Sequence, residues 1–168
     1  MPAELPTVAQ LRQVARRRPR GRLFDDFTIG QQFVHHWGRT LTESDNTLFC
    51  SLTLNYNPLY LNVVYARAHG HDGTIINPYL VFLVVFGLSV EDLSEAGIAF
   101  LGVDDLTFHA VVRPGDTLTA RSTVTELRKS ASRPGAGIAT WHTEGFREDG
   151  TLVVDFRRTN LLRTSEAI

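Results

Sequence analysis

The stretch Pro78-Tyr-Leu-Val-Phe-Leu-Val-Val-Phe-Gly-Leu88 is apolar at nearly every position. Proline suits the first turn of a helix, where its missing N–H is not needed. We therefore expect a helix over residues 78–93. A helix that is apolar all round must be buried on several sides. An antiparallel sheet wrapped around it would provide that burial, so this stretch predicts a single α+β domain with a central apolar helix.

The C-terminal half of the chain supplies the strands of that sheet. We expect them over residues 99–111, 117–128, 137–147 and 152–162. The intervening turns contain the Pro and Gly residues typical of turns: Arg113-Pro-Gly-Asp116, Arg133-Pro-Gly135 and Asp149-Gly150. The second strand shows the alternation of a strand with one covered face, through Leu118, Ala120, Ser122 and Val124.

Short elements precede the central helix. Residues 32–39 form a strand candidate. Thr42-Glu-Ser-Asp45 has the form of a helix capping box, which predicts a helix over residues 46–54. A second short helix is expected over residues 61–68. Between these two helices lies the turn Asn55-Tyr56-Asn57-Pro58-Leu59-Tyr60.

Composition narrows the class of protein. The chain has 168 residues, 43% of them hydrophobic, which is enough for one globular domain with a sizeable core. A net charge of −1 gives no reason to expect nucleic acid as a partner. The first residues lack the apolar h-region of a secretory signal, so none is expected, and no apolar run approaches the roughly 18 residues of a membrane span. We expect a soluble cytoplasmic protein in which Cys50, the one cysteine, is a small core residue.

The first 22 residues differ from the rest. Residues 7–18 predict a short helix, and arginines then surround Pro19 and Gly21. We divide the chain into a basic arm, 1–22, and a domain, 23–168. The arm is either a solvated charge run or a site that attracts the phosphates of a CoA-type ligand, and the sequence leaves both interpretations open.

The order of these features resembles the MaoC-like hydratases, with itaconyl-CoA and mesaconyl-CoA hydratase-like members nearest. These are single-domain hot-dog enzymes, lyases that add water to enoyl thioesters or remove it. The resemblance runs from about Phe24 to Leu162 and rests on the Asn-x-Asn-Pro turn, the apolar helix, the Leu-Gly strand at residues 100–103 and the Pro-Gly-Asp turn. It implies a CoA or acyl-carrier thioester as substrate and no cofactor. It also implies side-by-side pairing, as a homodimer or as a heterodimer with a related hot-dog chain.

The family's catalytic pair is altered here. In the family the turn reads Asp-x-Asn-Pro-x-His, and the Asp and His handle water and proton; this chain has Asn55 and Tyr60. An amide can hold water without taking its proton. A phenol, with an ordinary pKa of about 10, donates a proton more readily than it accepts one. The family's oxyanion N–H comes from a strand glycine that matches Gly102, so the expected catalytic residues are Asn55, Tyr60 and Gly102.

Further candidates surround this group. We expect Asn57, Asn77 and Asp104 to contact substrate, with Asn77 standing where many family members carry His. Asp45 is a candidate base, although its capping role is favoured, and His69 and His71 are others; His109 is expected at the sheet exterior or an interface. The histidines lack the spacing of a metal site, so no metal is expected.

Three functions follow from these residues. The leading hypothesis is a hydratase or dehydratase acting on an acyl thioester. The second is a non-catalytic, acyl-binding subunit of a heteromeric dehydratase, since both titratable groups of the family pair are replaced. The third is hot-dog thioester hydrolysis, for which only Asp45 and Asp104 offer a carboxylate.

Overall fold

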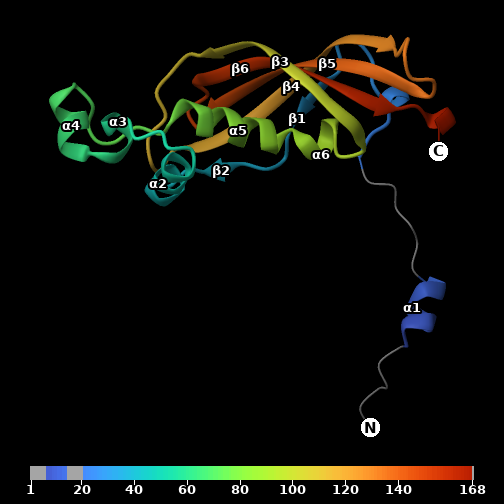
Figure 1. The fold of residues 1–168 in the computed structure, drawn as a ribbon, viewed down its shortest axis with the longest axis horizontal. Coiled ribbons are helices and arrows are strands. Elements are labelled where there is room, and N and C mark those ends of the chain that lie inside the picture. Colours follow the sequence, from blue (N-terminus) through green and yellow to red (C-terminus); the bar gives the residue numbers. More distant parts are fainter. Residues whose placement is uncertain (1–6, 15–20, 168) are drawn as a thin grey trace.

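The computed structural model describes residues 7–14 and 21–167. Figure 1 shows a sheet with one helix, α5, lying along its face. This arrangement of an antiparallel sheet around a central helix is the hot-dog fold. Helix α1 (Val8–Val14) lies within the helix expected over residues 7–18; the rest of that helix and most of the basic arm lie outside the described residues.

The sheet is antiparallel, with the order β1-β4-β5-β6-β3 and with β2 paired to β4. Its strands are β1 (Gln32–Val34), β2 (Arg39–Thr40), β3 (Gly97–Phe108), β4 (Thr117–Lys129), β5 (Ala136–Arg147) and β6 (Leu152–Arg163). The four long strands were predicted to within three residues at each end. The single strand expected over residues 32–39 was wrong: the ladder breaks at residues 35–38, where the buried His35 turns toward the core.

Two of the predicted helices are divided in the structure. The helices are α2 (Glu43–Leu52), α3 (Pro58–Leu61), α4 (Val63–Ala68), α5 (Pro78–Leu88) and α6 (Val90–Leu93), with 3-10 turns η1 (Phe24–Asp26) and η2 (Ser165–Ala167). The helix expected over residues 78–93 divides at Ser89, whose hydroxyl donates to the Phe86 carbonyl at 2.7 Å. The helix expected over residues 61–68 divides at Asn62, because its side chain caps α4 by accepting from the Tyr65 N–H.

The predicted capping box is confirmed, although α2 begins three residues earlier than expected. Thr42 Oγ1 accepts from the Asp45 N–H at 3.1 Å, and Asp45 Oδ2 accepts from the Thr42 N–H at 2.9 Å. Together these bonds satisfy two backbone donors that a helix start leaves unpaired. The capping role of Asp45 is thus the one that the structure shows.

Helix α5 lies close against the inner face of the sheet. Its buried side chains Val81 and Val85 face the strands. A Cβ at Gly145 would lie 2.5 Å from Val85, so glycine allows the close approach. The opposite side of α5 is open, with Tyr79 54% and Leu83 49% exposed. We expected this helix to be buried on several sides. Within the described chain it is buried only on the side that faces the sheet.

A polar row crosses the inner face between two hydrophobic clusters. His35 Nδ1 lies 2.7 Å from Asp92 Oδ2, and His35 Nε2 lies 2.8 Å from Ser122 Oγ. Ser122 Oγ in turn lies 2.8 Å from Thr143 Oγ1. Arg158 on β6 is also fully buried and lies opposite Trp141, next to this row. These bonds attach α6 to strand β4 through a buried hydrogen-bonded chain.

No helix in the described part of the chain is both long enough and apolar enough to span a membrane.

Candidate active site

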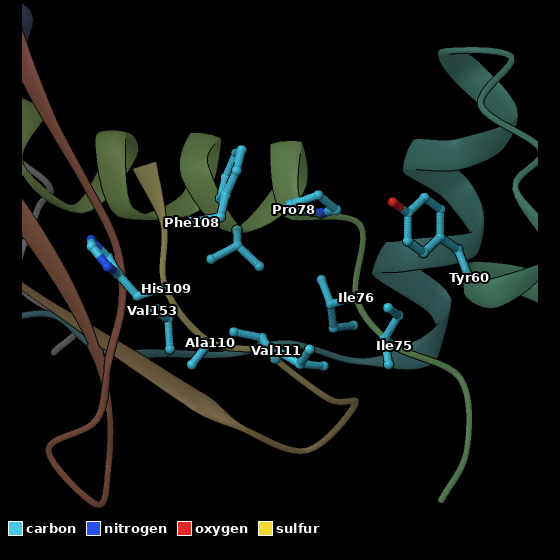
Figure 2. A pocket seen from close by; sticks show the side chains of 11 residues that line it. Tyr60, Ile75, Ile76, Pro78, Phe108, His109, Ala110, Val111 and Val153 are labelled. Carbon is cyan, nitrogen blue, oxygen red and sulfur yellow. The ribbon is translucent and has the colours of Figure 1, made fainter. Parts of the chain in front are cut away.

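An apolar pocket of about 230 Å³ lies at the start of α5. Residues from the 55–60 turn, the segment before α5, the end of β3 and the loop after it, and the start of β6 surround it (Figure 2). The lining residues are Tyr60, Ile75, Ile76, Pro78, Val81, Phe108, His109, Ala110, Val111, Val112 and Val153. Elements far apart in the sequence thus meet at one cavity.

Tyr60 is the predicted catalytic residue that lines this pocket. Figure 2 shows its hydroxyl directed toward Pro78. Burial raises the pKa of the Tyr60 phenol above its ordinary value, and the neighbouring Cys50 and Tyr79 raise it further. The phenol is therefore protonated at neutral pH and can donate a proton or a hydrogen bond.

A buried asparagine holds the Tyr60 turn against the start of α5. Asn46 Nδ2 donates to the carbonyls of Tyr60 and Ile75, both at 3.0 Å. Its Oδ1 accepts from the Asn77 N–H at 2.8 Å. Sequence reasoning did not single out Asn46; a lone amide on the apolar side of α2, beside the buried Cys50, was the available signal.

Asn57 and Asn77 are helix caps. Asn57 Oδ1 accepts from the Leu59 N–H at 3.0 Å, and Asn77 Oδ1 accepts from the Tyr79 N–H at 2.9 Å. Asn77 is fully buried, and its Nδ2 lies 3.7 Å from Cys50 Sγ. Cys50 is a buried core residue, as predicted. The structure accounts for both asparagines by capping, and their contact with substrate stays a prediction.

Asn55 is not among the residues that line the pocket. It follows Leu54, which has φ 56° in the turn that ends α2, and its N–H donates to the Cys50 carbonyl at 2.9 Å. A positive φ is unusual for a branched side chain. This left-handed residue sets the direction in which the chain leaves α2 toward Asn55 and Tyr60.

Gly102 and Asp104 lie on β3, the edge strand of the sheet, and not in the pocket lining. A Cβ at Gly102 would meet nothing within 4 Å, so its position is open. Asp104 is exposed, as is Asp105, which has φ 54° where the β3–β6 register is irregular. The structure therefore brings Tyr60 to the pocket and places Gly102 and Asp104 along a free sheet edge.

The other candidate bases, His69 and His71, lie outside the pocket lining, whereas His109, expected at the sheet exterior or an interface, is a lining residue. His69 stacks on Tyr65 with ring centroids 3.9 Å apart, and neither it nor His71 lines the pocket. His109 contributes to the lining, but its imidazole points away from Tyr60 (Figure 2), and its Nε2 lies 2.6 Å from Asp155 Oδ1. Within residues 7–14 and 21–167, no cluster of His, Cys, Asp and Glu could hold a metal ion.

Comparison with known proteins gives a consistent result. The family model described as mesaconyl-CoA hydratase matches residues 3–168. A mesaconyl-CoA hydratase of Haloarcula marismortui is 40% identical over 150 residues, covering 89% of this chain and 42% of the relative. An (R)-specific enoyl-CoA hydratase of Aeromonas caviae is 33% identical over 106 residues, covering 63% of this chain and 75% of the relative.

A solved structure shows the same similarity. It is described as a putative MaoC domain protein dehydratase from Chloroflexus aurantiacus, is 36% identical and superposes with a TM-score of 0.82. It covers 86% of this chain and 41% of that protein. The chain thus spans less than half the length of the mesaconyl-CoA hydratase and of this dehydratase.

Proposed function

The chain belongs to the mesaconyl-CoA hydratase family of MaoC-like hot-dog proteins, and from this we propose that it adds water to an enoyl thioester or removes it from the 3-hydroxyacyl thioester. The observation that carries the proposal is the place of Tyr60. A protonated phenol, at the position where the resemblance puts the family's histidine, meets an apolar pocket able to hold an acyl group. Relatives named as hydratases and dehydratases support the reaction class.

The chemistry requires a proton at Cα and water at Cβ. We propose that Tyr60 O–H delivers the proton to Cα as water, held by Asn55, adds to Cβ. The proton lost by that water then returns to the Tyr60 oxygen, so that the enzyme ends the cycle unchanged. This division of roles suits a phenol whose pKa is raised and an amide that cannot titrate.

The thioester oxygen needs a hydrogen-bond donor as the enolate forms. We propose the Gly102 N–H, and because β3 is an edge strand the site would be completed beside a second hot-dog unit. The exposed apolar residues Tyr79, Leu83 and Phe100 on α5 and β3 support such pairing, with a second copy favoured over a related chain. Light scattering of the purified chain tests this; a monomer at micromolar concentration would contradict it.

A second candidate is a non-catalytic acyl-binding subunit. It is favoured by the absence of any Asp or Glu among the described residues that line the pocket. Thioester hydrolysis gains no support. Asp92, His35 and Ser122 have the partners of a hydrolytic triad, but Ser122 is fully buried and no carbonyl can reach its hydroxyl.

The experiment is turnover of enoyl-CoA and 3-hydroxyacyl-CoA thioesters by the purified chain, followed by absorbance of the conjugated thioester. Tyr60→Phe should lower kcat at least 100-fold, because the ring stays and the transferred proton is lost. Tyr56→Phe, at a 61% exposed tyrosine of the same turn, is the matched control and should be fully active. Full activity in a folded Tyr60→Phe protein would remove Tyr60 from the mechanism. Binding without turnover by the unmodified chain would favour the subunit.

A further inference from the structure

Asn46 is a fully buried amide on α2 whose side chain uses all of its hydrogen-bonding groups. A primary amide offers two donors and two acceptor positions. The two donors are taken by the carbonyls of Tyr60 and Ile75, and Oδ1 accepts from the Asn77 N–H. The thiol of Cys50, whose Sγ lies 4.0 Å away, donates to the same oxygen. Neither an aspartate, which lacks the donors, nor a leucine, which lacks both kinds of group, could make these bonds.

Helix α3, which carries Tyr60, has few other attachments. None of its residues is buried, and Figure 1 shows it with α4 beyond the end of the sheet. Among the described residues, two hydrogen bonds join it to segments distant in the sequence. One is the Asn46 bond to the Tyr60 carbonyl at 3.0 Å, and the other runs from the Ile75 N–H to the Leu59 carbonyl at 3.1 Å. The position of Tyr60 therefore depends on Asn46.

The two carbonyls that Asn46 binds belong to residues that line the pocket. Tyr60 and Ile75 both line it, and so does Pro78, which follows Asn77. Figure 2 shows Tyr60 and Ile75 on the same side of the cavity, with the Tyr60 hydroxyl directed toward Pro78. Asn46 itself is not a lining residue. It can therefore influence a reaction in the pocket only through the residues that it holds.

Proton delivery to Cα is sensitive to distance. In the proposed reaction the Tyr60 oxygen must come within reach of the reacting carbon, and a displacement of about 1 Å can lower a rate about 100-fold. A phenol on a four-residue helix with no buried side chain needs an anchor that is itself rigid. Asn46 meets this need, because it is fully buried and its hydrogen bonds fix the amide in one orientation.

Building on the proposed function, we propose that Asn46 is a positioning residue for Tyr60. Its amide fixes the Tyr60 turn and the segment before α5 at one separation, and this separation places the phenol at the acyl group. The role rests on the two donors of Nδ2, since the acceptor Oδ1 serves the start of α5. Loss of the donors should therefore reduce the rate of proton transfer more than it reduces substrate binding.

Asn46→Asp removes the two donors and keeps the size of the side chain. Its second oxygen would face the carbonyls of Tyr60 and Ile75, so burial and these two oxygens should raise the pKa of the new carboxyl above its ordinary value of about 3.9. At about pH 8 we expect kcat about 30-fold below that of the unmodified chain, with KM within about 3-fold. A kcat equal to that of the unmodified chain would contradict the proposal.

The pH dependence of Asn46→Asp identifies the lost donors as the cause. As the pH falls, protonation of the carboxyl supplies one O–H donor, so kcat relative to that of the unmodified chain should rise. A ratio that stays constant from about pH 8 to about pH 5 would show that the donors have no role. Taking the ratio removes the effect of the other titratable groups around the site, which are Glu43, Cys50, Tyr60 and Tyr79.

Hydrogen exchange measures the anchoring without any turnover. Asn46→Ser shortens the side chain, and exchange of the Ile75 N–H, which is bonded to the Leu59 carbonyl, should become at least about 10-fold faster. The Ile76 N–H is the internal reference, because it is bonded to the Val112 carbonyl and should exchange as before. Unchanged exchange at Ile75, or equal acceleration at both amides, would overturn the proposal. If the unmodified chain has no turnover, faster exchange at Ile75 alone still supports the anchoring, and it is the proposed reaction that fails.

Ser122→Ala is the matched control. The Ser122 hydroxyl is also fully buried and lies 2.8 Å from both His35 Nε2 and Thr143 Oγ1. Ser122 is on β4 and does not line the pocket. Its replacement should therefore lower Tm while leaving kcat, KM and exchange at Ile75 unchanged. An equal loss of kcat in Ser122→Ala and Asn46→Asp would make Asn46 merely structural. Circular dichroism establishes that each variant is folded.

Discussion

Replacing Arg158 with methionine should make the folded chain more stable. Arg158 is fully buried, and its Nε, Nη1 and Nη2 atoms have no hydrogen-bond partner among the described residues. Its guanidinium carbon lies 4.4 Å from the ring centroid of Phe86 and 5.4 Å from that of Trp141. Among the described residues, these aromatic faces are the contacts that offset the loss of hydration of the buried charge.

Burial lowers the pKa of Arg158 to about 10, well below the ordinary value of an exposed guanidinium. At about 1.4 kcal/mol per pKa unit, the charged form is destabilised by about 3 kcal/mol in the folded state. Two cation–π contacts offset about 1 kcal/mol of this destabilisation. Methionine has a similar length and keeps the packing without the charge, so Arg158→Met should add about 2 kcal/mol and raise Tm by about 4–8 °C.

Urea denaturation followed by circular dichroism measures the change. Arg158→Lys keeps the charge, loses the planar stacking and should be less stable than the unmodified chain. Arg157→Met is the matched control, because its surface pair with Glu126 contributes at most about 1 kcal/mol. If Arg158→Met is less stable by more than about 1 kcal/mol, the buried charge has a compensating partner and the reasoning is refuted.

The lowered pKa of Arg158 determines how its destabilising effect changes with pH. The unfolded chain holds this proton more tightly than the folded chain, so the destabilisation is complete below about pH 10 and declines as the pH rises above that value. The advantage of Arg158→Met should therefore be constant between pH 7 and 9 and shrink above pH 10. An advantage that grows above pH 10 would contradict burial of the charge as its cause.

Three further measurements test the close packing of α5, the strained turn after α2 and the buried His35. Gly145→Ala should lower the free energy of unfolding, measured by urea denaturation, by about 1–3 kcal/mol, because the new Cβ would lie 2.5 Å from Val85. An unchanged free energy of unfolding would mean that α5 can move away from β5. Leu54→Gly should raise the free energy of unfolding by about 0.5–1 kcal/mol, because glycine adopts φ 56° without strain. A lower free energy of unfolding would show that the exposed leucine makes a contact in solution. Burial lowers the pKa of His35 against the opposing effect of Asp92, so stability should fall as pH drops below about 6.5, with a smaller slope in His35→Gln.

Local patterns predicted most of the secondary structure. Strand alternation, Pro-Gly turns and the capping box depend on residues close in sequence, and the structure contains each of them. The predicted alternation through Leu118, Ala120, Ser122 and Val124 is the buried side of β4. The helix lengths were predicted less well, because Ser89 and Asn62 use side-chain hydrogen bonds that divide a continuous apolar run.

The candidate site was predictable only in part. The resemblance identified the turn that carries Tyr60, and the structure places this residue at a pocket. The resemblance could not identify Asn46, whose three hydrogen bonds join α2 to residues 14, 29 and 31 positions away. Nor could it show that Asn57 and Asn77 use their amide oxygens as caps.

The sequence by itself determined the order of the elements, the covered side of β4 and the family, because these depend on strand periodicity, turn residues and the order of motifs. Only the tertiary structure decided which residues that are distant in the sequence come into contact. The register that sets Trp141 opposite Arg158 on β5 and β6 puts in the core a cation that has no hydrogen-bond partner among the described residues, and folding brings Tyr60, Ala110 and Val153 to one cavity. Such contacts depend on the register between strands and on α5 resting on them, which no local pattern encodes.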